Sequence, residues 1–420
     1  GRAIADCVRD MGPSAPMNRL LQGDVGSGKT AVAAALCHAV IREGMQSAMM
    51  APTEILATQH YHSLDKLLAP AGIRVELLTG SVTPKNKKRI YSALESGEIQ
   101  LIIGTHALLS EGVQFNDLAL VITDEQHRFG VEQRSALAKK GNAPHLLVMS
   151  ATPIPRTLAL MIYGDLDISI LDELPPGRQP IETYCIDSTK RLRAYKYIQK
   201  HLDEGRQGYM ICPLVEQGEN DLASVTAYKE FVKDYFPPET TAVLHGKMKS
   251  KEKDAVMSGF MNGEYKLLIS TTVVEVGVDV PNAVIMLIEN AEMYGLSQLH
   301  QLRGRIGRGV HQSTCILLTD AQNEEALSRM KVMCATTDGF KIADADLSMR
   351  GPGDFFGQRQ HGLPRLKIAD MMKDLATLRE AQECAGQILK NDPTLKNHPE
   401  LLTEINRLFV VSGNDLAMIL

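Results

Sequence analysis

Short apolar segments recur through the first part of the chain, and each one ends in a glycine or a polar residue. Their length and their branched residues are typical of buried strands. Helical stretches such as residues 29–42 separate them. This alternation predicts a parallel sheet with helices on both faces and ligand-binding residues at the carboxyl ends of the strands. The predicted strands are RLLQG (19–23), SAMMAPT (47–53), VELLTG (75–80), LIIGTH (101–106), LALVITDE (118–125) and HLLVMSATP (145–153).

A second series with the same rhythm follows the segment LDELPPGRQP at 171–180. Its three prolines and one glycine interrupt both helices and central strands, so the segment predicts a domain boundary. The strands stop near residue 321, and the pattern becomes helical. The predicted strands of the second series are TYCID (183–187), YMICPLVE (209–216), TAVLHG (241–246), KLLISTT (266–272), AVIMLIEN (283–290) and TCILLTD (314–320).

Four domains are therefore expected. Residues 1–174 and 175–321 form two α/β domains of similar size, residues 322–365 form a helical hairpin with a loop, and residues 366–420 form a small helical appendage.

Composition narrows the class of protein. The chain of 420 residues is 44% hydrophobic and 23% charged, which is ordinary for globular domains, and its longest apolar run, from Ala31, is too short to span a membrane. The formal net charge of −5 excludes a histone-like basic coat, although local basic patches can still bind nucleic acid.

The seven cysteines are scattered singly and form no CxxC pair, so they predict neither a zinc site nor a disulfide framework. Cys37, Cys212 and Cys315 lie in apolar runs and are expected to be small core residues. This usage fits a reducing cytoplasm.

The segment GDVGSGKT joins the first predicted strand to a strong helix-forming segment. It matches G-x-x-x-x-G-K-[ST], in which backbone N–H groups and a helix N-terminus bind phosphate. Lys29 is expected to reach the β- and γ-phosphates, and Thr30 to bind Mg²⁺. The alternative is a glycine-rich turn without chemistry. The predicted nucleotide-binding residues are Gly23, Asp24, Val25, Gly26, Ser27, Gly28, Lys29 and Thr30.

The strand LALVITDEQH supplies the carboxylates for phosphoryl transfer. Asp124 is expected to hold Mg²⁺ together with Thr30, and Glu125 to orient or deprotonate the attacking water. A solvated strand end is the alternative, and the phosphate-binding loop upstream in the same sheet favours the catalytic interpretation.

Positive charge for the transition state is expected from QLHQLRGRIGRG at 298–309, which carries Arg303, Arg305 and Arg308. Hydrolysis would then depend on closure of the two domains. A solvated basic turn or a nucleic-acid loop is the alternative. His300 is expected to be a bystander.

These motifs, in this order across two α/β domains, resemble those of the superfamily 2 helicases over about residues 17–310. Within that superfamily the chain is most similar to the RecG family of branched-DNA helicases. The resemblance implies two tandem RecA-like P-loop domains, with parallel sheets flanked by helices, and a C-terminal helical hairpin and appendage. It is carried by MNRLLQGDVGSGKT, DEQHRFGVEQR, SATPIPRTLAL, DELPPGRQP, STTVVEVGVDVPNA and HQLRGRIGRG.

The resemblance implies an ATP- and Mg²⁺-dependent helicase that translocates on double-stranded DNA. It would act on branched DNA in recombination and repair, through replication-fork reversal and Holliday-junction branch migration. The implied setting is the bacterial cytoplasm, at the nucleoid, as a monomer, with single-strand-binding protein or other replication and repair factors as partners. The rivals are the translocase module of transcription-repair coupling factor, an RNA helicase, and a non-hydrolysing nucleotide- or DNA-binding scaffold.

The resemblance also assigns roles to individual residues. Gln301, Arg305 and Arg308 match the γ-phosphate sensor and arginine-finger positions. A larger set would contact the DNA backbone or couple hydrolysis to strand movement. In the first domain it comprises Pro52, Thr53, Glu54, Gly104, Thr105, His106, His127, Ser150, Ala151 and Thr152, and in the second His245, Gly246, Thr271, Thr272, Glu275, Gly277 and Asp279.

Two lysine clusters, at 85–89 and 247–253, are read as solvated faces, with a preference for DNA contact in the second because it follows the predicted contact Gly246.

The segment SMRGPGDFFGQRQHG at 348–362 combines glycines with basic and amide side chains. By resemblance it is the loop that converts domain closure into translocation. Phe355 and Phe356 would anchor it, and Arg350, Arg359 and Gln360 would face DNA or the arginine-finger helix.

The chain starts with Gly1 in what reads as the later part of a helix, which predicts a fragment. No wedge domain with an OB-fold is expected before residue 17, and residues 1–18 lack the glutamine that reads adenine in relatives. We therefore expect ATP binding but poor unwinding of forked DNA.

Overall fold

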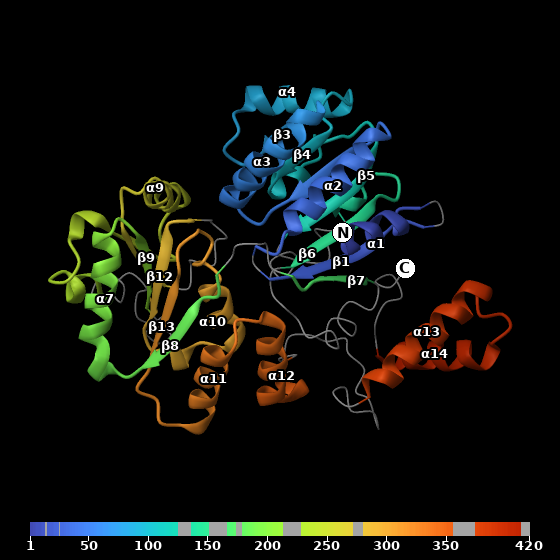
Figure 1. The fold of residues 1–420 in the computed structure, drawn as a ribbon. Helices are drawn as coiled ribbons and strands as arrows, with labels where there is room; N and C mark the ends of the chain where they lie inside the picture. The colour runs from blue at the N-terminus through green and yellow to red at the C-terminus, as the bar shows by residue number, and fades with distance from the viewer. Residues whose placement is uncertain are drawn as a thin grey trace. The chain divides into compact units, whose positions relative to one another are not determined.

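The computed structural model describes residues 1–12, 15–24, 26–124, 136–150, 166–173, 179–212, 228–271, 280–355 and 374–412. The chain divides into two compact units. One unit holds both sheets and continues to Asp346. The other holds the end of α12 (Gly339–Phe355) together with α13 (Leu375–Asn391) and α14 (Pro399–Ser412). Figure 1 shows both sheets and labels the helices and strands.

The first sheet has seven parallel strands in the order β3-β4-β2-β5-β6-β1-β7. Parallel pairing brings all seven carboxyl ends to one edge, where the predicted site residues should gather. The strands are β1 (Asn18–Gly23), β2 (Gln46–Met50), β3 (Val75–Leu78), β4 (Leu101–Gly104), β5 (Leu118–Asp124), β6 (His145–Ser150) and β7 (Asp167–Leu171).

Alternate residues of these strands enter two different cores. In β2, Met49 packs with one hydrophobic cluster, while Ala48 and Met50 pack with another on the opposite face. Both clusters are buried because helices cover both faces, as the continuous apolar strands predict. Helices α1 (Arg2–Asp10), α2 (Lys29–Arg42) and α3 (Glu54–Leu68) cover one face, and α4 (Pro84–Glu95) covers the other.

The second sheet has six parallel strands in the order β10-β11-β9-β12-β13-β8. Its carboxyl ends also share one edge. The strands are β8 (Glu182–Ile186), β9 (Gln207–Ile211), β10 (Thr241–Leu244), β11 (Leu267–Ser270), β12 (Ala283–Ile288) and β13 (Thr314–Leu318).

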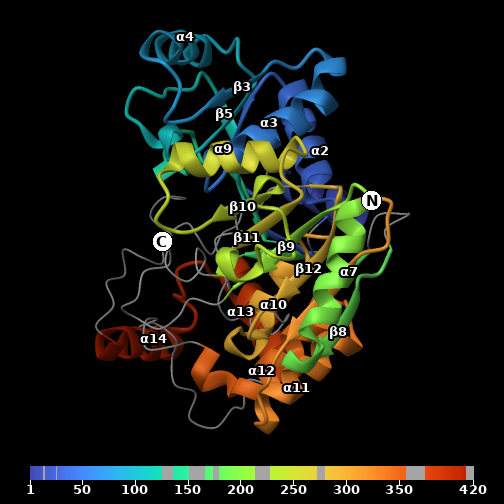
Figure 2. The ribbon, with the colours of Figure 1, turned by 90° about the vertical axis from the view of Figure 1, so that its left-hand side faces the viewer.

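Helices also cover both faces of this sheet. On one side lies α7 (Arg191–Asp203), in front of the strands in Figure 2, and its Ile198 packs on Met210 of β9. On the other side lie α9 (Ser250–Met261), α10 (Leu296–Arg303) and α11 (Glu324–Ala335). Single-turn helices are η1 (Ala69–Ala71), η2 (His106–Leu109), η4 (Ser188–Lys190), η5 (Pro238–Thr240) and η7 (Ala291–Met293).

The twelve strands expected from the sequence are all present. The prediction missed one strand, β7, which forms the edge of the first sheet beside β1. Its segment DISIL is short and begins with two exposed or half-buried positions, so its apolar signal is weak. Its alternation of polar and branched residues was the available signal.

The helical character of the C-terminal part is confirmed. Most of its described residues lie in α11 and in α12 (Gly339–Phe355), α13 (Leu375–Asn391) and α14 (Pro399–Ser412). One expectation needs correction, because α12 continues through residues 348–355, which were expected to begin a loop. The rest of the segment 348–362 lies outside the described residues.

Cys37, Cys212 and Cys315 are buried, as expected. Burial raises the pKa of the Cys37 and Cys315 thiols to about 12, which keeps them protonated and unreactive. Among the described helices, none combines the length and the apolar character that crossing a bilayer requires.

A buried arginine fastens the N-terminal helix to the first sheet. Arg19 of β1 donates from Nε to Asp10 of α1 at 2.9 Å and from Nη1 to Ser169 of β7 at 2.8 Å. Its side chain is only 7% exposed, so the guanidinium depends on these partners. The contact joins α1, β1 and the edge strand β7.

We predict that Asp10→Ala lowers the free energy of unfolding by about 3 kcal/mol, because it leaves the buried Arg19 guanidinium without its carboxylate. Urea-induced unfolding measures the change. The control is Arg2→Ala, which removes an exposed ion pair with Asp172 from the same helix and should cost less than about 1 kcal/mol. Equal losses in the two variants would contradict the assignment.

Candidate functional site

The loop between β1 and α2 has the backbone geometry of an anion-binding turn. It leads from Gly23, the last residue of β1, to Lys29, the first residue of α2. Gly26 and Gly28 adopt φ angles of 79° and 93°, in the left-handed region that only glycine enters at little cost. The loop therefore ends at a helix N-terminus, where N–H groups without intrahelical partners can bind phosphate.

Lys29 lies folded over this loop. Its Nζ donates to the carbonyl oxygens of Gly23 at 2.8 Å and Asp24 at 2.9 Å. Thr30 follows in the first turn of α2. The Lys29 ammonium has three N–H donors, so it can bind a phosphate oxygen beside these carbonyls or in place of one of them.

Close packing explains the glycine at the start of the loop. A Cβ on Gly23 would lie 2.5 Å from Ser27 Oγ and 2.8 Å from Leu171 Cβ of β7. Ser27 Oγ is buried and has no hydrogen-bond partner among the described residues. A buried hydroxyl without a partner fits a loop that receives a polar ligand.

Asp124, the last residue of β5, is buried and directed toward a histidine. Its Oδ2 lies 2.7 Å from Nε2 of His60 in α3. His60 carried no prediction, because 64 positions separate it from Asp124 and no local pattern connects the two residues. The neighbouring predicted residue Glu125 lies outside the described residues.

The oxygen donors here fit Mg²⁺. Thr30 supplies a hydroxyl and Asp124 a carboxylate, both at the carboxyl edge of the first sheet, and Mg²⁺ in nucleotide sites takes few protein ligands with phosphates and waters. Among the described residues, no group of three or more His, Cys, Asp or Glu side chains could hold a metal ion by itself.

Helix α10 and the turn after it carry the residues predicted to meet the γ-phosphate. Gln301 is half-buried in the helix, and Arg305, two residues past its end, is buried. Arg308 donates from Nε to the carbonyl oxygen of Gly304 at 3.1 Å. This bond orients the start of its guanidinium.

Arg303 has a structural role that the sequence analysis did not separate from the other two arginines. It is 1% exposed, and its Nη1 donates to the carbonyl oxygens of Met333 at 2.7 Å and Thr336 at 3.0 Å and to Thr183 Oγ1 at 3.2 Å. Burial lowers the pKa of the Arg303 guanidinium. Its bonds to the C-terminal end of α11 and to β8 make it an anchor for α10.

His300, which was expected to be a bystander, contacts the phosphate loop. It is buried in α10, and its Nε2 lies 3.1 Å from Oδ1 of Asp24 in the phosphate-binding loop. Its Nδ1 lies 3.3 Å from Nη2 of Arg303. The predicted arginine-finger helix and the predicted phosphate loop are thus in contact through a side chain that carried no prediction.

In the first sheet, two predicted DNA-contact residues have clear local functions. Thr53 caps α3, because its side chain accepts a hydrogen bond from the Leu56 N–H at 3.3 Å, and the half-buried Pro52 precedes it. A Cβ on Gly104 would lie 2.2 Å from the Leu78 carbonyl oxygen, so the close approach of β3 and β4 requires glycine.

Polar side chains follow at the same edge. Thr105 is 2% exposed, and its Oγ1 has no hydrogen-bond partner among the described residues. His106 is exposed at the start of η2. Ser150 ends β6 beside Gln22, next to the start of the phosphate loop.

The second sheet has a matching pair of polar residues. His245 and Thr271 directly follow Leu244 of β10 and Ser270 of β11, which are register partners. Both side chains are buried, and His245 Nδ1 and Thr271 Oγ1 lack partners among the described residues. The exposed Gly246 comes next, so this strand edge presents polar atoms that a ligand can satisfy.

The two lysine clusters begin helices. Residues 85–89 lie in the first turns of α4, where Arg89 pairs with Glu76 at 2.9 Å. Residues 247–253 lead into α9, where Lys253 donates to the Gly246 carbonyl oxygen at 2.7 Å.

Several predicted residues cannot be placed. Arg350 lies in α12, and its side chain is not among those described. The residues outside the described ranges are Val25, Glu125, His127, Ala151, Thr152, Thr272, Glu275, Gly277, Asp279, Arg359 and Gln360.

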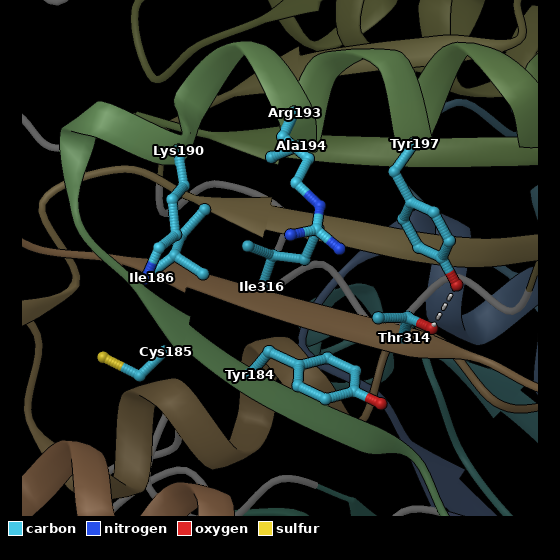
Figure 3. Close-up of a pocket in the computed structure, with 9 residues that line it drawn as sticks. All are labelled: Tyr184, Cys185, Ile186, Lys190, Arg193, Ala194, Tyr197, Thr314 and Ile316. Carbon is cyan, nitrogen blue, oxygen red and sulfur yellow. Dashed lines mark hydrogen bonds between the residues drawn. The ribbon is translucent and has the colours of Figure 1, made fainter.

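Two clefts lie at different places on the described part of the chain. One, of about 390 Å³, adjoins the phosphate loop, between Ser27 and Gly28 on one side and α1 and the end of β7 on the other. The other, of about 440 Å³, lies between α7 and the edge strand β8 and is mostly apolar (Figure 3). It contains none of the predicted site residues.

Two parallel sheets, a P-loop segment on the first and an arginine-bearing segment on the second define the fold class as tandem RecA-like P-loop domains. The matching family models agree. They are a DEAD/DEAH box helicase over residues 5–161, a helicase conserved C-terminal domain over 190–310, and the C-terminal part of domain 3 of the ATP-dependent DNA helicase RecG over 336–409.

The chain belongs to the RecG family of helicases. It is 49% identical over 402 residues to the ATP-dependent DNA helicase RecG of Synechocystis, covering 95% of this chain and 48% of that protein. It is 48% identical over 421 residues to RecG of Bacillus subtilis, covering 99% of this chain and 62% of that protein. The chain thus spans about half to three-fifths of the curated relatives it matches.

Solved structures show the same relationship. A structure of RecG bound to a three-way DNA junction superposes with a TM-score of 0.77 at 44% identity, covering 90% of this chain and 49% of that chain. Yeast Dbp5 bound to RNA and ADP–BeF3 superposes at 0.57 with 16% identity, covering 91% of this chain and 92% of that chain. The second match shows a shared fold alone.

We predict that His60→Ala raises the Mg²⁺ concentration needed for half-maximal ATP hydrolysis about tenfold, because Asp124 loses the partner that orients its carboxylate. A Mg²⁺ titration of the ATPase rate measures the change. His62→Ala is the matched control, since His62 is exposed two residues along the same helix. An unchanged Mg²⁺ requirement in His60→Ala would contradict the role.

Proposed function

We propose that the chain is the motor part of an ATP-dependent helicase that translocates on double-stranded DNA and acts on branched DNA. The observation that carries this proposal is the 44% identity, over 90% of the chain, to RecG bound to a three-way DNA junction. The family model of the RecG domain 3 C-terminal part supports it, because it matches the helices that follow the second sheet.

The phosphate loop would bind the triphosphate of ATP. Lys29 would exchange its contacts with loop carbonyls for the β- and γ-phosphates, and the N–H groups at the start of α2 would bind phosphate oxygens. Thr30 and Asp124 would hold Mg²⁺, which neutralises developing charge on the phosphates when bound. Glu125 would orient the attacking water.

The cleft of about 390 Å³ beside the loop is the proposed place for the base and ribose. It is lined by Ala31 and Val32 of α2 and by Ile170 and Leu171 of β7, which present apolar surface to a flat ring. Asp172 at its rim is an acceptor for a ribose hydroxyl.

Charge on the transferring phosphoryl group would be stabilised from the second sheet. Gln301, Arg305 and Arg308 lie on or directly after α10, and α10 touches the phosphate loop through His300. Guanidinium groups delivered in this way stabilise the transition state and link hydrolysis to the arrangement of the two sheets.

DNA would bind at the carboxyl edges of the sheets. In the first domain we propose Pro52, Thr53, Gly104, Thr105, His106, His127, Ser150, Ala151 and Thr152 as contacts or couplers. In the second domain we propose His245, Gly246, Thr271, Thr272, Glu275, Gly277 and Asp279. Hydroxyl, imidazole and backbone N–H groups suit phosphates, and phosphate contacts carry no sequence information, which permits stepping.

We also propose that the segment after α11 transmits domain closure to DNA, with Arg350, Arg359 and Gln360 facing DNA or α10. Support comes from the hydrogen bond of 3.1 Å between Ser297 and Asp346, which joins α10 to the first part of α12. The proposed protein acts as a monomer at the nucleoid in the bacterial cytoplasm. Its proposed partners are single-strand-binding protein or other repair factors.

We predict that Lys29→Ala abolishes ATP hydrolysis stimulated by forked DNA, with a loss of at least about a hundredfold, because no other described loop residue carries positive charge to the phosphates. Phosphate release with and without a synthetic fork measures it. Lys66→Ala, at an exposed position of α3, should retain the full rate. If neither forked nor duplex DNA changes the rate of ATP hydrolysis by the wild type, the proposed function is wrong.

We predict that Thr271→Val weakens binding of duplex DNA about tenfold, since the variant keeps the shape but loses a hydroxyl that bonds to a charged phosphate. Fluorescence anisotropy of labelled duplex measures the dissociation constant. The control is Thr314→Val, because Thr314 is also buried but begins its strand at the opposite edge of the same sheet. Equal effects of the two substitutions would exclude the assigned contact.

A further inference from the structure

Three side chains form a continuous hydrogen-bonded connection from the phosphate loop to α11. Asp24 of the loop meets His300 of α10 at 3.1 Å, and His300 meets Arg303 one turn later at 3.3 Å. Arg303 then donates to the Met333 carbonyl oxygen at 2.7 Å. The side chains of His300 and Arg303 are buried, and that of Asp24 is 23% exposed.

The bonding partners define where the protons lie. A guanidinium has only donors, so His300 Nδ1 must accept from Arg303. The imidazole proton is then on Nε2, which donates to the Asp24 carboxylate. The imidazole of His300 thus lies between the positive guanidinium of Arg303 and the negative carboxylate of Asp24. The two opposite charges are connected through its ring.

Asp24 joins two parts of the site. Its carbonyl oxygen accepts the Lys29 ammonium at 2.9 Å, and its carboxylate accepts His300. If Lys29 exchanges the Asp24 carbonyl for a phosphate oxygen, Asp24 loses this bond on its backbone while its carboxylate still faces His300. Asp24 therefore connects the phosphate loop with α10.

The other end of the connection is firmly held. Besides Met333, Arg303 donates to the Thr336 carbonyl oxygen and to Thr183 Oγ1. Arg305 and Arg308 follow within five residues, so a small movement of α10 displaces both.

We propose that His300 is a positioning residue for ATP hydrolysis: through Asp24 it aligns α10, and with it Arg305 and Arg308, against the loop that holds the phosphates. The inference rests on the proposed function and deepens it. His300 itself touches neither the reacting phosphate nor DNA in this assignment, and it acts through the arginines that follow it.

The first test separates alignment from binding. We expect His300→Ala to lower kcat for DNA-stimulated ATP hydrolysis about tenfold while KM for ATP changes less than about twofold, because the lost interaction serves the transition state. His300→Gln keeps an N–H donor and should recover about half of the loss. The control His311→Ala, at an exposed histidine of the same sheet domain, should match the wild type.

The second test is a double-mutant cycle with Asp24→Asn, which keeps the side-chain volume. If His300 acts through Asp24, the double variant His300→Ala/Asp24→Asn should have nearly the kcat of the slower single variant. Independent effects would instead multiply. Thermal unfolding of each variant shows whether a loss of rate comes only from a loss of fold.

The outcomes are distinct. Wild-type ATP hydrolysis that DNA does not stimulate overturns the proposed function. A DNA-stimulated wild type together with an unchanged kcat in His300→Ala overturns the inference alone. The inference is also overturned if the effects of His300→Ala and Asp24→Asn on kcat multiply in the double variant. It is likewise overturned if His300→Gln lowers kcat as much as His300→Ala does. Either result would give His300 a role unrelated to its bond with Asp24.

Discussion

Parallel strand pairing is the constraint on which every part of the site depends. Because all strands of a parallel sheet run in the same direction, their carboxyl ends open on one edge, and backbone turns there can face a ligand. In the first sheet this brings Gly23, Asp124 and Ser150 to one edge, although more than a hundred residues separate the first from the other two. In the second sheet it brings His245 beside Thr271 through the register of β10 and β11.

The three arginines at the end of α10 and in the turn after it have different roles. Arg303 is bound to main-chain carbonyls and a threonine hydroxyl, so its charge is committed to holding α10. Arg305 and Arg308 come after the helix ends, and a different function is proposed for them. A buried guanidinium with several carbonyl acceptors is a structural element, because moving it would leave both it and the carbonyls without partners.

His60 and His300 have the same kind of structural role. His60 holds the carboxylate of Asp124, and His300 holds that of Asp24, each from a helix distant in sequence. His300 is buried and His60 is half-buried, and each touches a residue of the predicted nucleotide site without being part of its motif. Residues of this kind orient the groups that bind nucleotide, and small changes in their geometry alter the site.

The sequence alone determined the elements and their class. Runs of apolar residues ending in polar ones marked every strand except β7, and the phosphate-loop pattern placed Lys29 at a helix N-terminus, because both signals are local in the chain. Only the tertiary structure decided which strands are neighbours, that α12 continues to Phe355, that Arg303 is an anchor, and that His60 and His300 meet carboxylates. Those outcomes depend on contacts between residues far apart in sequence, and no local periodicity encodes such contacts.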